Sequence, residues 1–428
     1  RAGMKAGAAL AALLGRRIPR DPDRLLPLNR KLNLLLVPET FAFLVFVGIQ
    51  QARLERERPD PAAAFADFQG RADADSPDVW HLILDRYAST ATLADRYGYD
   101  NRPFLEQLRR RGFAAADGFS NYQRTGHSVA STLNGAYLDP LAAPMAARQT
   151  DWVPLYRARR SRRALSFFEA NGYRTVFAGS WWNRTGRSAA ADDNVNYRAL
   201  PELARLILDQ SAFGFVLRQL ALPYGDVRAD QCRRAAFKFD RLRALAAEDG
   251  RKYVFAHFLV PHPPFVLDAD GGCRSLAEAG AASPRDNYLA QVENANRELL
   301  RLVDAIAAGP RPAAIVIHAD EGPWPHPHVG DEGFPGRDPV SVDWARLDRA
   351  RLVEKMGILI AVRPADARPL ALPASPVNVY PSLLRTYFGR RDPPLPDRHF
   401  VFTGDRSLYT FQDVGPRLRV SSEFPTSR

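Results

Sequence analysis

The chain has 428 residues, of which 46% are hydrophobic and 25% are charged, and this balance excludes a disordered protein. Two cysteines exclude a disulfide scaffold and a cysteine-based zinc finger, although Cys232 and Cys273 are able to form one bridge in an oxidising compartment. The length fits about three domains, or one large α/β domain with an appendage.

The chain is basic, with a net charge of +11 from 59 basic and 48 acidic residues. Almost all of the basic residues are arginine. No basic run interleaved with aromatic residues is present, so the sequence predicts no nucleic-acid partner. A basic surface next to anionic lipid is the interpretation that we favour, and simple solvation of the surface is the alternative.

Residues 1–51 have the pattern of a membrane-associated segment. Residues 32–49 form an apolar run, interrupted by Pro38 and Glu39, that is just long enough for a short or tilted span. An interfacial or core helix is the alternative, and Glu39 favours it. Because the chain starts at Arg1 rather than at a methionine, we expect this segment to be a fragment of a longer membrane region.

Basic residues are concentrated just before the apolar run. The positive-inside rule therefore places residues 15–31 in the cytoplasm and everything after about residue 52 outside the membrane. Residues 52–77 are polar and rich in Ala, Asp and Pro, and we interpret them as a linker. A folded domain is expected over residues 78–428.

Beyond residue 77, apolar strand-like runs alternate with helical patterns, which predicts an α/β sheet. The predicted strands cover residues 79–84, 113–120, 175–180, 252–260, 313–320 and 356–362. The predicted helices cover residues 100–111, 128–138, 201–221, 229–248, 286–307 and 375–389. The C-terminal segments HFVFTGD, SLYTF and RLRVS predict a small β appendage.

Carboxylates follow two of the predicted strands. In open α/β sheets the ligand site lies beyond the carboxyl ends of the strands. Asp85 follows the strand 79–84, and Asp320 and Glu321 follow the apolar run 313–318. Carboxylate oxygens are the ligands that Mg²⁺, Mn²⁺ and Ca²⁺ prefer. A single carboxylate at a strand end is more often a turn or capping residue, so the spacing alone does not establish a metal site.

A hydroxyl lies next to an expected helix start. In the segment NYQRTGHSVASTLNG, Ser128 is the expected N-cap, which places Arg124 and Thr125 just before a helix N-terminus. Free N–H groups at such an end attract anions. A hydroxyl there can be activated by a metal and attack phosphorus. The alternative is that Thr125 simply makes a turn.

Taken in order, these segments resemble the sulfatase-like branch of the alkaline phosphatase superfamily. The resemblance rests on Asp85 after an apolar strand, on FLEQLRRRGF (104–113), FSNYQRTGHSVASTLNGAYL (119–138), PHPPF (261–265) and IHADEGP (317–323). It covers residues 77–390 and is strongest to the membrane-bound hydrolases and transferases that include lipoteichoic acid synthase and the phosphoethanolamine transferases. It implies a mixed, mostly parallel central sheet with helices on both faces.

The resemblance implies a role for individual residues. Asp85 matches the first metal-binding acid, Thr125 the nucleophile that also touches the metal, and Asp320 the Asp of the Asp-His-Gly metal motif. Glu321 stands where that motif has its metal-binding His, and we expect it to be a ligand as well. The residues expected to contact the substrate are Arg124, His262, His326 and His328.

Two departures from the family pattern shape the expected chemistry. Glutamate binds Mn²⁺ or Mg²⁺ well, so Glu321 favours these ions, with Ca²⁺ and Zn²⁺ as alternatives. Type I sulfatases need a Cys or Ser at the nucleophile position for conversion to formylglycine. Thr125 cannot be converted, which disfavours sulfatase activity.

The expected function is that of a membrane-anchored, extracytoplasmic phosphotransferase or phosphodiesterase that forms a phospho-threonine intermediate. A membrane lipid head group or an envelope glycan is the expected substrate. We expect the anchor in the bacterial inner (cytoplasmic) membrane and residues 78–428 in the periplasm. One alternative is a catalytically inactive sulfatase-like binding protein of the cell envelope, and another is a sulfuric ester hydrolase.

Overall fold

The structure is a computed structural model, and it describes residues 22–57, 65–159, 162–180, 186–197, 207–208, 210–220, 227–325, 342–391, 393–404 and 406–419. The chain folds as two compact units, Arg1–Arg58 and Pro59–Arg428. The first unit contains helix α2 (Pro22–Glu57), which continues through Pro27 and Pro38.

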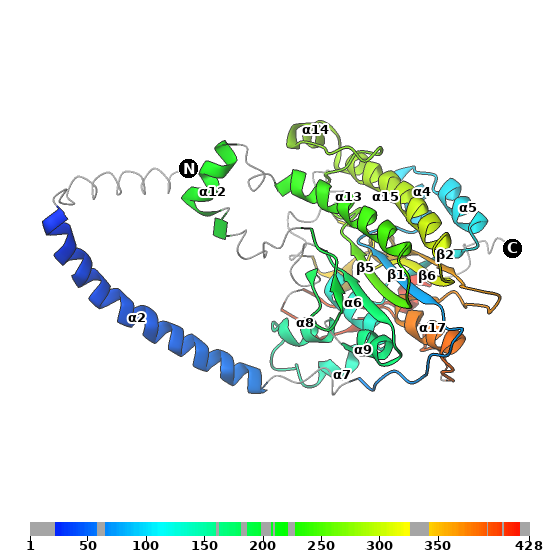
Figure 1. Ribbon diagram of the computed structural model, residues 1–428, viewed down its shortest axis with the longest axis horizontal. Helices are drawn as coiled ribbons and strands as arrows, with labels where there is room; N and C mark the ends of the chain where they lie inside the picture. The colour runs from blue at the N-terminus through cyan, green and yellow to red at the C-terminus, as the bar shows by residue number, and fades with distance from the viewer. Residues whose placement is uncertain are drawn as a thin grey trace. The chain divides into compact units, whose positions relative to one another are not determined.

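The second unit contains strands and helices in alternation (Figure 1). Its strands are β1 (Asp78–Leu84), β2 (Ala114–Phe119), β3 (Arg174–Ala178), β4 (Asp193–Asn194), β5 (Lys252–Phe258), β6 (Ala313–Ala319), β7 (Gly357–Arg363), β8 (Phe400–Val401) and β9 (Gln412–Asp413). Its α-helices are α4 (Thr90–Tyr97), α5 (Arg102–Arg110), α6 (Thr125–Asn134), α7 (Asp139–Ala142), α8 (Val153–Arg159), α9 (Arg162–Ala170), α12 (Ala212–Gln219), α13 (Val227–Ala246), α14 (Leu276–Ala281), α15 (Pro284–Ala307), α16 (Arg349–Met356), α17 (Val379–Tyr387) and α18 (Gly415–Leu418). Two short 3₁₀ helices are η3 (Trp344–Arg346) and η4 (Pro376–Asn378).

Helix α2 exposes many of its apolar side chains, among them Leu34, Val37, Phe41, Phe43, Phe46 and Ile49. Within the described ranges, no helix combines the length and the hydropathy needed to cross a membrane. The helix runs past residue 52 to Glu57, so the start of the segment interpreted as a linker is helical. The sequence QARLERE consists largely of good helix formers, which explains the extension. Farther along that segment, Phe65 and Phe68 are buried in the second unit.

The second unit is built on a seven-stranded sheet with the order β2-β7-β6-β1-β5-β3-β4. β1 pairs in parallel with β5 and β6, and β3 pairs in parallel with β5 and β4. β7 is antiparallel to both of its neighbours, β2 and β6. The predicted mixed, mostly parallel sheet is therefore confirmed.

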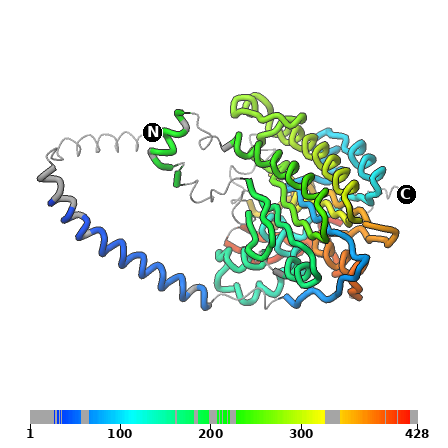
Figure 2. Tube along the Cα trace, in the orientation of Figure 1, coloured from blue at the N-terminus to red at the C-terminus, as the bar shows by residue number. Residues whose placement is uncertain are grey.

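Alternate residues of the central strands face two layers of helices. Trp80, Leu82 and Leu84 of β1 pack in one core with α5, α13 and α15. Val79 and Ile83 pack in a second core with α6, α9 and α17. Figures 1 and 2 show α13 and α15 running side by side over one face, with α6, α9 and α17 grouped apart from them. Both faces of the sheet are thus covered by helices, as the sequence predicts.

The helix after β2 begins earlier than the sequence predicts. Arg124 is the N-cap residue, with an extended backbone (φ −132°, ψ 136°), and α6 starts at Thr125. The prediction that Ser128 caps the helix is wrong, because Ser128 lies buried in the first turns. The helix ends at Gly135, whose left-handed backbone (φ 52°) suits glycine. Thr125 is therefore the first residue of the helix rather than a residue before it.

The C-terminal region differs from its prediction in two segments. β8 and β9 form a small sheet, but only β8 lies in a predicted segment, HFVFTGD. SLYTF forms no strand and is followed by β9, and RLRVS overlaps helix α18. Pro416 lies in the first turn of α18, where the missing N–H group of proline costs nothing. In the predicted helix 201–221, the described residues form α12 over Ala212–Gln219, and residues 201–206 lie outside the described part.

Cys232 of α13 and Cys273 form a disulfide bridge that ties the helix to the loop after β5.

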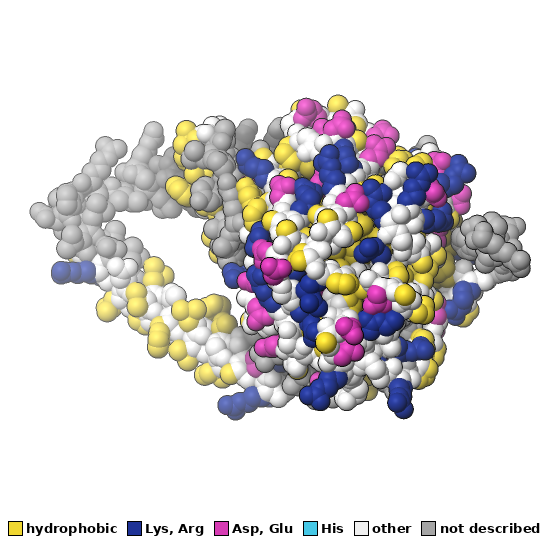
Figure 3. Space-filling model, turned by 45° about the vertical axis from the view of Figure 1, so that its right-hand side comes forward, with side chains coloured by type: hydrophobic (Ala, Val, Ile, Leu, Met, Phe, Trp, Pro, Cys, Tyr) yellow, Lys and Arg dark blue, Asp and Glu magenta, His cyan; other side chains and the backbone are white. Residues whose placement is uncertain are grey.

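The surface carries both signs of charge. In Figure 3, Lys and Arg side chains are spread over the visible face of the second unit and alternate with Asp and Glu. The positive net charge is therefore not gathered into one patch on that face.

Candidate metal centre and active site

Strand register brings three potential ligands to one rim of the sheet. Ile83 pairs with His257 on β5 and with His318 on β6, so these residues face the same side. Asp85 lies two residues after Ile83, and Asp320 lies two residues after His318. Because side chains alternate along a strand, both carboxylates point to the same side. Asp85, His257 and Asp320 each offer a ligand atom within 4.8 Å of the others. This spacing allows one ion to bind all three at bond lengths of about 2.0–2.6 Å.

The residues of this cluster fit a cation. All three side chains are buried. Burial, with a contribution from neighbouring carboxylates, raises the pKa of both Asp85 and Asp320 to about 7, although Arg86 acts against the rise in Asp85. Asp85 Oδ1 accepts no hydrogen bond from any group in the described part of the chain. Two buried carboxylates at this distance need a positive partner, and a divalent ion supplies it.

His257 was not among the predicted site residues. Its Nε2 lies 3.5 Å from Asp85 Oδ2, and burial lowers its pKa to about 4, so the imidazole is neutral and able to ligate near pH 7. The signal in the sequence was a single histidine inside the apolar run KYVFAHFLV. Its role becomes visible only from the register between β5 and β1, and the sequence pattern does not give that register.

Thr125 reaches the same cluster from the helical layer. It is the first residue of α6, and its side chain lies close enough to the Asp320 carboxylate to lower the pKa of that group against the effect of burial. Oδ1 of Asp320 also accepts the backbone N–H groups of Arg86 (3.2 Å) and Glu321 (3.0 Å). The structure thus brings together Asp85, Thr125 and Asp320, three of the residues that the sequence predicts for the site.

Glu321 is held by two cations. Its Oε1 lies 2.8 Å from Arg86 Nε, and its Oε2 lies 2.9 Å from Lys355 Nζ. Burial raises the pKa of Glu321, but Lys355 and Arg86 outweigh that effect and the pKa is lowered overall. Lys355 is itself buried, and its Nζ lies 5.2 Å from the centre of the Trp344 ring. Both oxygens of Glu321 therefore have a cationic partner.

Arg86 contacts several residues of the site through both its backbone and its side chain. It is the non-glycine residue with a left-handed backbone (φ 64°) in the described part of the chain. Its N–H group donates to Asp320, and its carbonyl oxygen accepts from the Tyr288 hydroxyl at 2.9 Å. Left-handed backbone costs about 1–3 kcal/mol in a non-glycine residue, and such residues cluster at functional sites.

Further cations surround the cluster. Arg124 acts on Glu321 electrostatically and helps to lower its pKa, while Lys238 and Arg159 both act to lower the pKa of His257. Burial lowers the pKa of Lys238 to about 7, so a neighbouring anion decides how much of it is protonated. Together with Arg86 and Lys355, these side chains outnumber the three acids, and the site is suited to an anionic substrate.

The predicted substrate contacts have different outcomes. His262 lines a pocket beside the carboxyl end of β5, and its Nδ1 contacts the Pro263 carbonyl oxygen. Arg124 lies at the N-cap of α6. His326 and His328 lie outside the described residues.

A mostly parallel sheet that brings three potential metal ligands and a helix-terminal hydroxyl to one rim is typical of a sulfatase-like hydrolase or phosphoryl transferase. The model of the family described as Sulfatase matches residues 77–338, which is more than half of the chain. The chain belongs to the sulfatase family. No curated protein sequence matches it.

Solved structures with a similar fold are only distantly related in sequence. The C-terminal periplasmic domain of EcEptC from Escherichia coli, in complex with Zn, is 12% identical and has a TM-score of 0.47, with 80% of this chain and 93% of that chain covered. The integral membrane protein lipooligosaccharide phosphoethanolamine transferase A (EptA) from Neisseria meningitidis is 12% identical with a TM-score of 0.42, covering 85% and 60%. A protein in the alkaline phosphatase superfamily from Vibrio parahaemolyticus is 12% identical with a TM-score of 0.41, covering 82% and 81%.

Proposed function

We propose that this chain is a metal-dependent phosphodiesterase or phosphotransferase in which Thr125 is the nucleophile. The observation that carries the proposal is the meeting of Thr125 with Asp320, which lies within ligand distance of Asp85 and His257. A hydroxyl at a helix N-terminus and a neighbouring cluster able to hold a divalent ion together provide what nucleophilic attack on a phosphate ester requires.

Each residue of the site has a role in this scheme. Asp85, His257 and Asp320 would hold the ion, which supplies charge for the phosphoryl oxygens and lowers the pKa of a neighbouring hydroxyl. Thr125 Oγ1 bonds to phosphorus as the bond from phosphorus to the leaving oxygen breaks. The proton of Thr125 passes to the leaving oxygen, which departs as the alcohol. Water or a second alcohol then attacks the phospho-threonine and restores Thr125.

The surrounding cations position the substrate. Arg86 and Lys355 pair with Glu321 and offset the three acids, so that a bound ion would leave a positive centre for an anionic ester. The free N–H groups at the start of α6 add to this field. The field suits phosphate and sulfate esters alike. Thr125 selects the phosphate ester, since a threonine cannot become the formylglycine of type I sulfatases.

The ligand set bears on the identity of the ion. Two carboxylates and one imidazole form a mixed oxygen and nitrogen set, which suits Zn²⁺ or Mn²⁺ better than Mg²⁺ or Ca²⁺. Glu321 no longer favours Mg²⁺, because its carboxylate is paired with Arg86 and Lys355. We expect Zn²⁺ or Mn²⁺ as the working ion.

The proposed location is outside the cytoplasmic membrane, with α2 as part of the anchor and a lipid head group or envelope glycan as the substrate. The Cys232–Cys273 bridge supports an oxidising compartment, since disulfides are rare in the cytosol. The exposed apolar side chains of α2 support contact with lipid. A reporter fused after residue 60 that is active only after export tests this location, and cytoplasmic activity of the fusion would contradict it.

The nucleophile is tested by comparing Thr125→Ala with Ser128→Ala. Ser128 lies on the same helix, and its buried hydroxyl has no hydrogen-bond partner in the described part of the chain. We expect Thr125→Ala to abolish turnover of bis(p-nitrophenyl) phosphate with Mn²⁺, Thr125→Ser to retain part of it, and Ser128→Ala to retain all of it. Intact mass spectrometry should detect a phosphoryl adduct that requires Thr125.

Other outcomes would favour other functions. Turnover that survives in Thr125→Ala but is lost in Ser128→Ala would move the chemistry to Ser128. Wild-type protein that binds Mn²⁺ but turns over no phosphate or sulfate ester would favour the inactive envelope-binding protein. Turnover of p-nitrophenyl sulfate well above that of the phosphodiester would favour a sulfuric ester hydrolase.

A further inference from the structure

The turn that follows β1 holds Arg86 in an unfavourable backbone conformation. Arg86 has a φ of 64°, and within the described residues no other non-glycine residue has a positive φ. The left-handed region brings the Cβ atom of such a residue close to the backbone. A conformation of this kind persists only where the surrounding structure imposes it. The neighbours of this turn must therefore supply the contacts that keep Arg86 in place.

One hydroxyl group bridges the two sides of the turn. Tyr288 Oη donates to the Arg86 carbonyl oxygen at 2.9 Å and accepts the N–H group of Ala88 at 3.2 Å. Tyr288 is 1% exposed and Ala88 is fully buried, so a turn that relaxed would leave buried polar groups without partners. This pair of hydrogen bonds, the Tyr288 bridge, therefore favours the left-handed conformation of Arg86 over an ordinary one.

The same conformation directs two groups of Arg86 toward the site. Its N–H group donates to Asp320 Oδ1 at 3.2 Å, and its Nε donates to Glu321 Oε1 at 2.8 Å. A change in φ turns the side chain of a residue relative to its own N–H group. An ordinary negative φ at Arg86 would therefore break one of these two contacts, and the guanidinium group would no longer be fixed beside Glu321.

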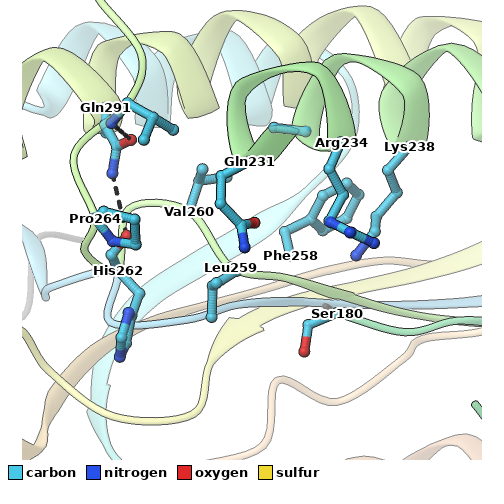
Figure 4. Close-up of a pocket in the computed structure, with 12 residues that line it drawn as sticks. Ser180, Gln231, Arg234, Lys238, Phe258, Leu259, Val260, His262, Pro264 and Gln291 are labelled. Atoms are coloured by element: carbon cyan, nitrogen blue, oxygen red, sulfur yellow. Dashed lines mark hydrogen bonds between the residues drawn. The ribbon is translucent and has the colours of Figure 1, made fainter. Parts of the chain in front are cut away.

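Tyr288 is itself held firmly by its surroundings. It lies on α15, and its ring packs against the rings of Tyr97 and Phe265, with centroid distances of 5.2 and 6.4 Å. One turn farther along α15, Gln291 Nε2 donates to the His262 carbonyl oxygen at 3.2 Å, and Figure 4 shows Gln291 beside the loop that contains His262. The helix is thus fastened to the loop after β5, and the Tyr288 hydroxyl is a preorganised partner for the turn.

We propose that Tyr288 is a positioning residue, which keeps the guanidinium group of Arg86 where it offsets the acids of the site and favours an anionic ester. The inference rests on the proposed function and adds to it a residue on α15 that acts through the backbone of Arg86. The Tyr288 bridge contacts only the backbone of the turn. Its loss should therefore weaken the binding of an anion only as long as residue 86 carries the guanidinium group.

The test is a double-mutant cycle between Tyr288→Phe and Arg86→Gly. The probe is orthophosphate, and its affinity for the full chain saturated with Mn²⁺ is measured by isothermal titration calorimetry, so the readout is independent of turnover. A titration of orthophosphate into Mn²⁺ without protein is subtracted. Tyr288→Phe keeps the ring and removes the hydroxyl, and we expect it to weaken orthophosphate binding about threefold to tenfold.

The second background separates a positioning role from a merely structural one. Arg86→Gly should also weaken orthophosphate binding, because it removes the guanidinium group, but glycine adopts a φ of 64° without strain. In the Arg86→Gly background we therefore expect Tyr288→Phe to change the affinity by less than about twofold. A structural role of the hydroxyl would weaken binding by the same factor in both backgrounds.

Tyr173→Phe is the matched control. Tyr173 is 3% exposed, and its hydroxyl donates to the Pro77 carbonyl oxygen at 2.8 Å, just before β1 and at the opposite end of that strand from Arg86. The substitution removes the same kind of buried hydrogen bond and should leave the orthophosphate affinity within about twofold of the wild type. Mn²⁺ affinity is measured for every variant, so that all titrations are made at equal saturation.

An equal loss in both backgrounds, or a Tyr288→Phe protein with wild-type affinity, would overturn the proposal. A Tyr288→Phe chain that folds only together with Arg86→Gly would support it, and failure to fold in both backgrounds would overturn it. Failure of the proposed function would appear differently, as turnover that does not depend on Thr125. Wild-type protein that neither binds orthophosphate nor turns over an ester would contradict the proposed function and this inference together.

Discussion

His318 Nε2 lies 2.8 Å from His81 Nε2 in the buried layer of the sheet that leads to Asp320. The protonation of the pair is fixed by its neighbours. His318 Nδ1 lies 2.7 Å from the Ala319 carbonyl oxygen, which only accepts, so Nδ1 donates and Nε2 accepts. His81 Nε2 therefore donates to His318, and His81 Nδ1 accepts from the Tyr380 hydroxyl at 2.8 Å. Tyr380 in turn accepts from Tyr253.

This chain of donors predicts an asymmetric cost for its two tyrosines. Tyr380→Phe removes the donor to His81 and leaves a buried acceptor unsatisfied, which should lower the free energy of unfolding by about 1–3 kcal/mol. Tyr253→Phe removes only the last donor and keeps the ring, so its cost should be smaller. Urea unfolding of both variants checks the order, and an equal or larger loss for Tyr253→Phe would contradict the assigned direction of the chain.

The binding of metal should depend steeply on pH. Without a cation, Asp85 and Asp320 titrate near pH 7, whereas His257 titrates near 4 and is already neutral. Metal binding must displace the carboxyl protons, so the apparent affinity for Mn²⁺ should fall below pH 7 by about tenfold per pH unit for each proton displaced. Calorimetry between pH 5 and 8 in buffers of different ionisation enthalpy measures both. An affinity that does not change over this range would contradict the raised carboxyl pKa values.

The same carboxyls should make the metal-free protein less stable as the pH rises. Their folded pKa of about 7 lies above the unfolded value of 3.8, so between these values the folded state holds more protons than the unfolded state. Their contribution to stability is full below about pH 4 and is lost as the pH rises through 7. Asp85→Asn should reduce this loss and also abolish metal binding, whereas Asp304→Asn, at an exposed ion pair with Arg111, should change neither.

Gly322 should tolerate no side chain. A Cβ atom at this position would lie 2.2 Å from the backbone oxygen of Glu354. The N–H group of Gly322 donates to the Lys355 carbonyl oxygen at 2.6 Å. Gly322→Ala would force the Glu321 loop away from Lys355, at a cost of about 1–3 kcal/mol in unfolding free energy and with weakened Mn²⁺ binding. Gly280→Ala, which meets no atom within 4 Å, is the matched control. Equal thermal midpoints for the two variants would argue against this close approach.

The disulfide should contribute substantially to stability. Replacing both Cys232 and Cys273 by serine opens a link across 41 residues and should cost about 2–4 kcal/mol. Unfolding with and without a reductant measures the effect, and the reductant should not change the double variant. A wild-type protein that is insensitive to reductant would show that the bridge is absent or energetically silent.

The sequence predicts the sheet well because its buried strands are continuous apolar runs, as in VWHLIL and AAIVIHAD. The carboxylates Asp85 and Asp320 could be found because they follow those runs. His257 could not, because its role depends on the register between β5 and β1. Glu321 is expected to be a ligand because it stands where the family motif has its metal-binding His. Its pairing with Arg86 and Lys355 depends on the fold and could not be predicted from the sequence.

Lys355 reaches the site because β7 runs against its neighbours. The carboxyl ends of β1 and β6 face the site, and for β7 the amino end does, so the residue that matters comes just before the strand. The proposed ligands and the lysine that balances their charge therefore lie on different segments of the chain. Because Gly322 N–H donates to the Lys355 carbonyl oxygen and Lys355 pairs with Glu321, the end of α16 is tied to the segment that carries Asp320. A change in the length of α16 should therefore affect both the charge balance and the ligands.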